Sequence, residues 1–253
     1  MTDPNRIYDL LLAQCPSNIK IEKVFMGLVW TLCQTSLGHG LAMSAPCAVR
    51  TLPWSGELVE KSVLDIAAWI VEWNPHQASV AMAVINSCIN TQLDNFPNTM
   101  FLNHTSVYRN LAVFDYFLPQ LLGKNVVVIG HYPNIEQYQH QMQLTVLEKQ
   151  PTGIDLPDVA CEFLLSKADW VFITATSIPN KTFPRLAQLA SSAKTVLMGP
   201  TTPWLSQLRE FDIDYLAGVE IINPILLEQT IAQGGGVKIF EQCVRYRIAD
   251  LAV

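Results

Sequence analysis

The chain has 253 residues, half of them hydrophobic, and a formal net charge of −6. Such a chain can bury a large core, in one large domain or in two small ones. Only 15% of the residues are charged, and the Lys and Arg residues form no cluster, which argues against a nucleic-acid partner because phosphate backbones select basic patches.

The first part of the chain predicts an α+β unit. Apolar residues at helical spacing predict helices, and runs rich in β-branched and aromatic residues predict strands. The expected helices cover residues 3–14, 58–73 and 77–90, and the expected strands cover residues 19–31 and 40–43, with a third strand near Val49. Residues 34–40 have the composition of a turn between strands, and the Asn74-Pro75 break separates the last two helices.

The pattern changes near residue 105, where an irregular stretch, residues 96–108, leads to a helix at residues 111–122. Short apolar strands then alternate with helical stretches, as in a series of βαβ units with a mainly parallel sheet. The expected strands are residues 125–129, 143–147, 169–173, 195–198 and 214–217, and the expected helices are residues 134–140, 158–166, 183–191, 204–210 and 224–233. We therefore predict two domains, residues 1–105 and 106–253.

Small, polar and rigid loops follow four of these strands. The residues that point to a site are Gly130, His131 and Tyr132 in the first loop, Glu148 and Asp155 in the second, Thr174, Thr176 and Asn180 in the third, and Gly199, Thr201 and Thr202 in the fourth. Because parallel strands end at one edge of a sheet, these loops are expected to form one rim that suits a polar or anionic ligand. The alternative interpretation is that they are ordinary caps and turns, in which such residues abound.

Both glycine signatures of nucleotide binding are absent. The first expected strand runs into Gly130-His131-Tyr132-Pro133 instead of GxGxxG, and no Walker A pattern occurs. Residues 234–236 are three glycines after the last expected helix, where a helix C-cap and a turn explain them. We therefore expect NAD and ATP to bind weakly or not at all in their usual modes.

Several motifs occur in a characteristic order: VIGHYP, LEKQPTGIDLP, ADWVFITATSIPNKT, LMGPTTPW, YLAGVEIINP and a late GGG. Over residues 120–240 the chain resembles a bacterial and archaeal family of unknown function called "putative heavy-metal chelation" proteins, domain of unknown function 364. The segments GLVWTLCQTSLGHGLAMS and ASVAMAVINSCIN resemble the amino-terminal domain of that family, whose fold is similar to the enolase amino-terminal domain.

The resemblance implies an enolase N-terminal-like cap, a Rossmann-like domain after it, and a site in the cleft between them. It also implies a metal or metal-complex ligand, so a divalent or heavy-metal ion is the expected cofactor class. The chain departs from the family pattern at Thr174-Ala175-Thr176-Ser177, where a Thr-Gly-Thr-Thr-like turn is expected. The methyl group of Ala175 narrows the approach of a ligand to the backbone there.

No local set of metal ligands is present, because the five histidines and six cysteines form no HxH, HExxH or CxxC motif. A metal site must therefore be assembled in space, and the candidates are His131, Glu148, Asp155 and His39. Each also has a structural alternative, such as a helix cap, an ion pair or a hairpin turn. Cys33 and Cys88 lie in apolar stretches and are predicted to fill the core.

Asn86 lies in an expected helix of small and branched residues that permits close packing. Its side chain is expected to reach across the domain boundary to a ligand, or else to be a buried asparagine satisfied by nearby backbone.

Two functions of different classes follow. The favoured one is a binding protein for a small polar or anionic ligand or a metal complex. The other is an enzyme, a transferase or lyase with a nucleotide-like cofactor, in which His131 is the acid or base and Glu148 or Asp155 orients it. The start of the chain lacks the basic residues and apolar core of a signal peptide, and no apolar run approaches the roughly 18 residues of a membrane span. We expect a cytoplasmic protein with reduced cysteines and no membrane or nucleic-acid partner. The sequence leaves open whether the protein forms a homo-oligomer.

Overall fold

The computed structural model describes residues 3–89, 96, 99–102 and 107–251. The predicted boundary at residue 105 lies outside these described residues. Within them, no helix is long and apolar enough to cross a membrane.

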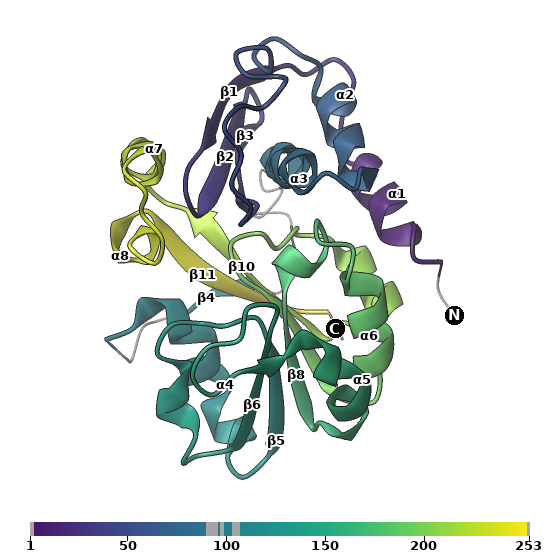
Figure 1. The fold of residues 1–253 in the computed structure, drawn as a ribbon, viewed down its shortest axis with the longest axis vertical. Helices are drawn as coiled ribbons and strands as arrows, with labels where there is room; N and C mark the ends of the chain where they lie inside the picture. Colours follow the sequence, from purple (N-terminus) through teal and green to yellow (C-terminus); the bar gives the residue numbers. More distant parts are fainter. Residues whose placement is uncertain (1–2, 90–95, 97–98, 103–106, 252–253) are drawn as a thin grey trace.

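The first part of the chain forms a three-stranded antiparallel sheet in the order β1-β2-β3, with helix α3 packed on one of its faces (Figure 1). The elements are α1 (Arg6–Leu12), β1 (Ile21–Met26), β2 (Trp30–Thr35), β3 (Gly38–Met43), α2 (Val63–Ala67), the 3-10 helix η1 (Ala68–Val71) and α3 (Pro75–Ile89). The predicted break before α3 is confirmed, because Asn74 caps this helix by accepting hydrogen bonds from the backbone N–H groups of His76 and Gln77.

The turn predicted over residues 34–40 is present but shorter, and the single strand predicted at residues 19–31 is wrong, because β1 and β2 are separate strands there. Thr35 pairs with Gly38, so the turn itself contains only Ser36 and Leu37, and its polar flanks extend the two strands. The third strand is therefore β3, and Val49 lies in the connection between β3 and α2.

The rest of the chain builds an eight-stranded mixed sheet in the order β4-β11-β10-β9-β8-β5-β6-β7. Its strands are β4 (Thr99–Phe101), β5 (Asn125–Ile129), β6 (Gln143–Glu148), β7 (Leu156–Pro157), β8 (Trp170–Thr174), β9 (Lys194–Met198), β10 (Tyr215–Ile221) and β11 (Val244–Asp250). All neighbours from β10 to β7 are parallel, whereas β11 is antiparallel to both β10 and β4. The predicted mainly parallel sheet is confirmed, and β11 was not predicted.

The connecting helices are mostly short. They are η3 (Arg109–Leu111), α4 (Ala112–Leu121), η4 (Ile135–Tyr138), η5 (Asp158–Ala160), α5 (Cys161–Leu164), η6 (Leu165–Lys167), η7 (Ala175–Ser177), α6 (Phe183–Ala190), η8 (Ser206–Phe211), α7 (Pro224–Ala232) and α8 (Ile239–Gln242).

Strand β5 is central, and the chain runs from it to β6 and β7 on one side and then to β8, β9 and β10 on the other. The topological switch point therefore lies between β5 and β8, where ligands bind in open α/β sheets. The first strand of the βαβ series therefore borders this point.

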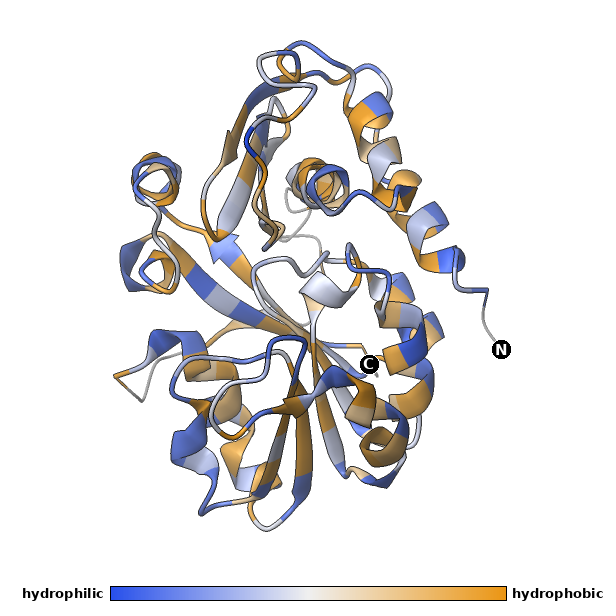
Figure 2. Cartoon of the chain, in the orientation of Figure 1, coloured by the Kyte–Doolittle hydropathy of each residue, from blue (hydrophilic) through white to orange (hydrophobic). Residues whose placement is uncertain are grey.

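Two hydrophobic clusters cover the two faces of this sheet. Val127 and Val171 belong to one cluster, together with residues of α1, α3 and α6, and Val126 and Phe172 belong to the other, together with residues of α4 and Trp30 of β2. Figure 2 shows the hydrophobic β5 and β8 between helices whose hydrophobic and hydrophilic residues alternate. Each cluster thus joins the three-stranded sheet or its helices to the large sheet.

Strand β3 and helix α3 approach each other unusually closely at Gly40. A Cβ atom at this position would lie 2.1 Å from both the Ala83 carbonyl oxygen and the Ser87 backbone nitrogen. Every residue from Ala78 to Ile89 is buried, so the helix has no room to retreat. Only glycine fits at position 40.

Lys181, which follows β8, joins the large sheet to the first part of the chain. Its Nζ donates hydrogen bonds to the carbonyl oxygens of Ile70 (2.6 Å) and Pro179 (3.1 Å), and it lies 5.4 Å from the ring centre of Tyr8. Burial lowers the pKa of Lys181 to about 8 from its ordinary 10.5.

Replacement of Gly40 by alanine is expected to lower the free energy of unfolding by more than about 2 kcal/mol, because backbone atoms must move to admit the methyl group. Urea unfolding measures this loss. The matched control is Gly236→Ala, where a Cβ atom would lie 3.5 Å from Val29 and is tolerated. Equal midpoints for both variants and the wild type would refute the close-packing argument.

A second prediction concerns pH. Because the folded-state pKa of Lys181 is depressed to about 8, the unfolded state binds more protons between about pH 8 and pH 10.5, and the free energy of unfolding rises with pH over this window. The rise is on the order of 1 kcal/mol after allowance for solvent screening. Urea unfolding at both ends of the window should show it in the wild type, and in the Lys181→Met variant it should be smaller by that amount. Identical pH profiles would contradict the assignment.

Candidate functional site

Three of the predicted site residues meet at the carboxyl ends of β5 and β6. The His131 backbone N–H donates to Glu148 Oε2 (2.9 Å), and His131 Nδ1 lies 3.0 Å from Asp155 Oδ1. The Asp155 side chain is fully buried, whereas 32% of the His131 side chain is exposed. The loop after β5 is therefore held by the two carboxylates of the loop after β6.

The Asp155 carboxylate is set up to hold the imidazole. Its other oxygen accepts hydrogen bonds from the Thr152 backbone N–H (3.0 Å) and hydroxyl (3.2 Å). Burial raises the pKa of the Asp155 carboxyl, but the hydrogen bonds from His131 and Thr152 outweigh it and hold the pKa below its ordinary value. An ionised Asp155 that accepts from Nδ1–H leaves Nε2 as the ring nitrogen for a metal or a proton.

Glu148 is occupied by the backbone. Besides the bond to His131, its Oε1 accepts from the N–H groups of Lys149 (2.7 Å) and Gln150 (3.3 Å). Both oxygens therefore order the loop, and Glu148 forms no ion pair with Lys149 or Lys181 within the part of the chain that the structure describes.

Tyr132 turns inward and packs beneath the edge. Its ring makes an edge contact with Phe114 at 5.6 Å, and its hydroxyl donates to the Met198 carbonyl oxygen at 3.5 Å. Burial raises the pKa of this hydroxyl far above its ordinary value. A Cβ atom at Gly199 would lie 3.6 Å from the same hydroxyl. Tyr132 thus supports the loop after β9.

The loop after β8 completes the switch point. A Cβ atom at Gly130 would lie only 3.2 Å from Thr174, so the two loops touch. The Thr174 hydroxyl donates to that of Thr176 (3.3 Å), which in turn lies 3.6 Å from the Met43 sulfur of β3. Asn180 donates its backbone N–H to the Thr176 carbonyl oxygen, one turn earlier.

Asn86 of α3 ties this edge to the three-stranded sheet. Its Nδ2 donates to the carbonyl oxygens of Leu41 (2.9 Å) and Thr201 (3.0 Å), and the Thr201 hydroxyl accepts from the Met43 backbone N–H (2.9 Å). The amide nitrogen of Asn86 therefore behaves as a buried asparagine satisfied by backbone. Its oxygen does not, because Oδ1 is buried without a partner.

Further buried polar atoms near this edge also lack a partner. They are Ser177 Oγ, Thr202 Oγ1 and Trp204 Nε1. An unsatisfied buried polar atom costs about 1–3 kcal/mol, so a group of them is a feature that stability alone does not explain. Ser177 and Trp204 were not predicted as site residues, although both lie in the loops after β8 and β9.

Two arginines were also missed. Strand β11 runs antiparallel to β10, so its beginning lies at the carboxyl edge. In the register of the two strands, Arg245 of β11 lies opposite Glu220 of β10. The guanidinium groups of Arg245 and Arg247 lie 3.4 and 4.5 Å from the ring centre of Phe101, and Arg247 forms an ion pair with Glu220 at 2.9 Å. They bring positive charge to the sheet face that carries Trp204.

His39 is placed elsewhere. It is half-buried in β3, where burial lowers its pKa and its charged neighbours are Glu228 of α7 and Lys23 of β1. No group of three or more His, Cys, Asp or Glu residues is arranged to hold a metal ion in the described ranges. Within those ranges, neither His39 nor His131 belongs to such a group.

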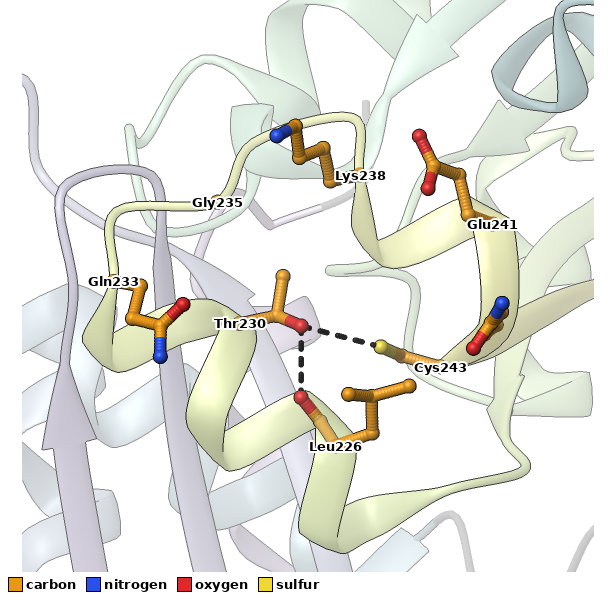
Figure 3. Close-up of a pocket in the computed structure, with 8 residues that line it drawn as sticks. Leu226, Thr230, Gln233, Gly235, Lys238, Glu241 and Cys243 are labelled. Carbon is orange, nitrogen blue, oxygen red and sulfur yellow. Dashed lines mark hydrogen bonds between the residues drawn. The ribbon is translucent and has the colours of Figure 1, made fainter.

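Two pockets are lined by residues other than those of this site. One, of about 250 Å³, is enclosed by α7, the glycine turn and α8, with the Thr230 hydroxyl and the Cys243 sulfur 3.6 Å apart (Figure 3). The other, of about 460 Å³, lies between Pro4, α6 and Phe211.

Comparisons with known proteins agree with this architecture. Residues 112–250 match the DUF364 family and residues 8–89 match the DUF4213 family, and both families are described as "Putative heavy-metal chelation". No curated protein matches the chain.

Two solved structures match almost the entire chain. A DUF364-family protein of unknown function from Desulfitobacterium hafniense is 27% identical, with a TM-score of 0.86, over 97% of this chain and 98% of that one. A DUF364-family protein from Pyrococcus horikoshii is 18% identical, with a TM-score of 0.75, over 98% of this chain and 99% of that one, and it supports the fold alone. Since the DUF364 match covers more than half of the chain, the protein belongs to the DUF364 family.

Proposed function

We propose that the carboxyl edge of the large sheet, beneath α3 and β3, binds a small polar or anionic ligand. The observation that carries this proposal is the group of buried, unpartnered polar atoms on Asn86, Ser177 and Thr202. A ligand that hydrogen-bonds to them removes a cost of about 1–3 kcal/mol per atom. The position at the switch point of the sheet supports the same conclusion.

Two guanidinium groups on one face of the sheet favour an anion. Arg245 and Arg247 lie on the same face as the loop after β9, and a guanidinium stacked on an aromatic ring is well suited to carboxylate or phosphate groups. Because the chain as a whole has a net charge of −6, two arginines at one place on the sheet stand out from its overall charge.

A metal held by this chain alone does not fit the edge. His131 supplies one imidazole, but both oxygens of Glu148 already accept backbone hydrogen bonds, and no group of three metal-binding side chains occurs in the described part. The description of the family as heavy-metal chelation fits this edge if the metal arrives as a complex with an anionic chelator. The oxygens of the chelator then bind to the protein. We also propose that the first part of the chain is an enolase N-terminal-like cap over this edge. Its antiparallel strands, followed by α2 and α3, fit such a cap.

One observation favours the enzyme alternative. His131 is held by a buried carboxylate at 3.0 Å, which is the arrangement of an oriented general acid or base. A ligand that is recovered chemically changed after incubation with the wild type, and unchanged after incubation with Asp155→Asn, would establish this function.

Thr202→Val separates function from stability. The valine removes a buried hydroxyl without a partner, so the free energy of unfolding is expected to rise by about 1 kcal/mol while ligand binding weakens. The control is Thr195→Val, because the Thr195 hydroxyl donates to the Asp212 carbonyl oxygen and its loss should destabilise the protein. Urea unfolding measures stability, and calorimetric titration with inorganic phosphate and with zinc citrate measures binding. A Thr202→Val protein that binds both probes like the wild type would contradict the proposed site.

His131→Ala is expected to weaken binding of the same probes by at least about tenfold and to lower stability by only about 1 kcal/mol, the value of one hydrogen bond. Native mass spectrometry of freshly purified wild type and variant, with elemental analysis, should show a retained ligand only in the wild type. A variant that melts several degrees lower but keeps its ligand would show that His131 is structural.

A further inference from the structure

A cysteine and a histidine form a pair that includes none of the proposed ligand-binding residues. Cys47 Sγ, in the connection after β3, lies 3.3 Å from His76 Nε2 in the first turn of α3. Cys47 is exposed to solvent, whereas His76 is 8% exposed. The sulfur is therefore accessible, and the imidazole behind it is fixed.

The surrounding backbone holds this pair in place. The Asn74 side chain accepts from the His76 backbone N–H at 3.0 Å, and Pro75 occupies the first position of the helix, so the imidazole projects from a capped first turn. The connection that carries Cys47 starts at Ser44, whose hydroxyl is bound to the Thr31 hydroxyl (3.0 Å) and the Gly27 carbonyl oxygen (2.9 Å). Donors on such supported elements need little reorganisation to bind an ion.

We propose that Cys47 and His76 form an open two-ligand site for a thiophilic divalent cation of the zinc and cadmium class. Two ligands of one tetrahedral zinc ion, with bonds of about 2.3 Å to sulfur and about 2.0 Å to nitrogen, lie about 3.5 Å apart. The observed separation of 3.3 Å is close to that value. Thiolate sulfur and imidazole nitrogen are also the ligands that this class of ion prefers.

Metal binding replaces the thiol proton of Cys47 with the cation. The thiol proton leaves to solvent, the sulfur binds the cation, and His76 donates its Nε2 lone pair in neutral form. Water or small ligands carried by the ion complete its coordination, because no third metal-binding side chain joins the pair in the described part of the chain. The site therefore resembles an acceptor of a partly coordinated ion more than a closed structural site.

A nucleophilic role fits the pair less well. An organic substrate needs an adjacent cavity, and neither of the two pockets described above includes Cys47 or His76. A metal ion requires no such cavity. The pair also shares no residue with the proposed ligand edge, so the two sites can be tested separately.

The test is titration of the full-length, reduced and metal-free protein with Cd²⁺, followed by cadmium–thiolate absorbance in the ultraviolet. The wild type is expected to bind one ion with this band, and Cys47→Ser to lose both the band and at least about tenfold in affinity. His76→Gln is expected to keep the band but lose about tenfold in affinity, as removal of one ligand does.

The matched control is Cys161→Ser, which removes a partly exposed cysteine of α5 and should titrate like the wild type. An unchanged band in Cys47→Ser, or wild-type affinity in His76→Gln, would overturn the proposal. If His76→Gln does not fold, X-ray absorption of the cadmium-loaded wild type decides, because sulfur without imidazole scattering would also overturn it. Phosphate binding at the sheet edge should be the same in Cys47→Ser, which separates this site from the proposed function.

Discussion

The structure depends on the absence of a side chain at Gly40. Because β3 and α3 are in backbone contact there, the same turn of the helix brings Asn86 within reach of two carbonyl oxygens, one in β3 and one in the loop after β9. The same approach places the Met43 N–H against Thr201. The three-stranded sheet is thereby attached to the carboxyl edge of the large sheet, and the loops that were expected to face a ligand lie beneath α3.

The sequence predicted correctly those strands whose residue pattern matches their burial in the fold. Strands such as β5 and β8 are apolar throughout because both faces are covered, and the loop that begins with His131 follows directly from that pattern. The pairing of His131 with Asp155 was not predictable in detail, because the two residues are separated by 24 positions and meet only through the packing of β6 beside β5. Both residues were candidates because the loops after neighbouring parallel strands lie at the same edge of a sheet.

The errors have physical causes as well. Strand β11 carries Arg245 and Arg247 on the face that a buried strand usually fills with apolar residues, and stacking on Phe101 compensates for this only in three dimensions. The residues beside the β2–β3 turn were assigned to a loop because Gln, Thr, Gly and His are common in turns, yet they occupy paired strands. His39, also a candidate ligand, lies in β3, where its charged neighbours include Glu228 of α7 and Lys23 of β1.

The ends of the large sheet limit how this protein can associate. In the part of the chain that the structure describes, one edge is β4, with three residues, and the other is β7, with two, one of which is Pro157. Such short edges expose too few backbone N–H and C=O groups to template pairing with a strand from another chain. At these two strands the large sheet is therefore protected from edge-to-edge pairing with another copy of the protein.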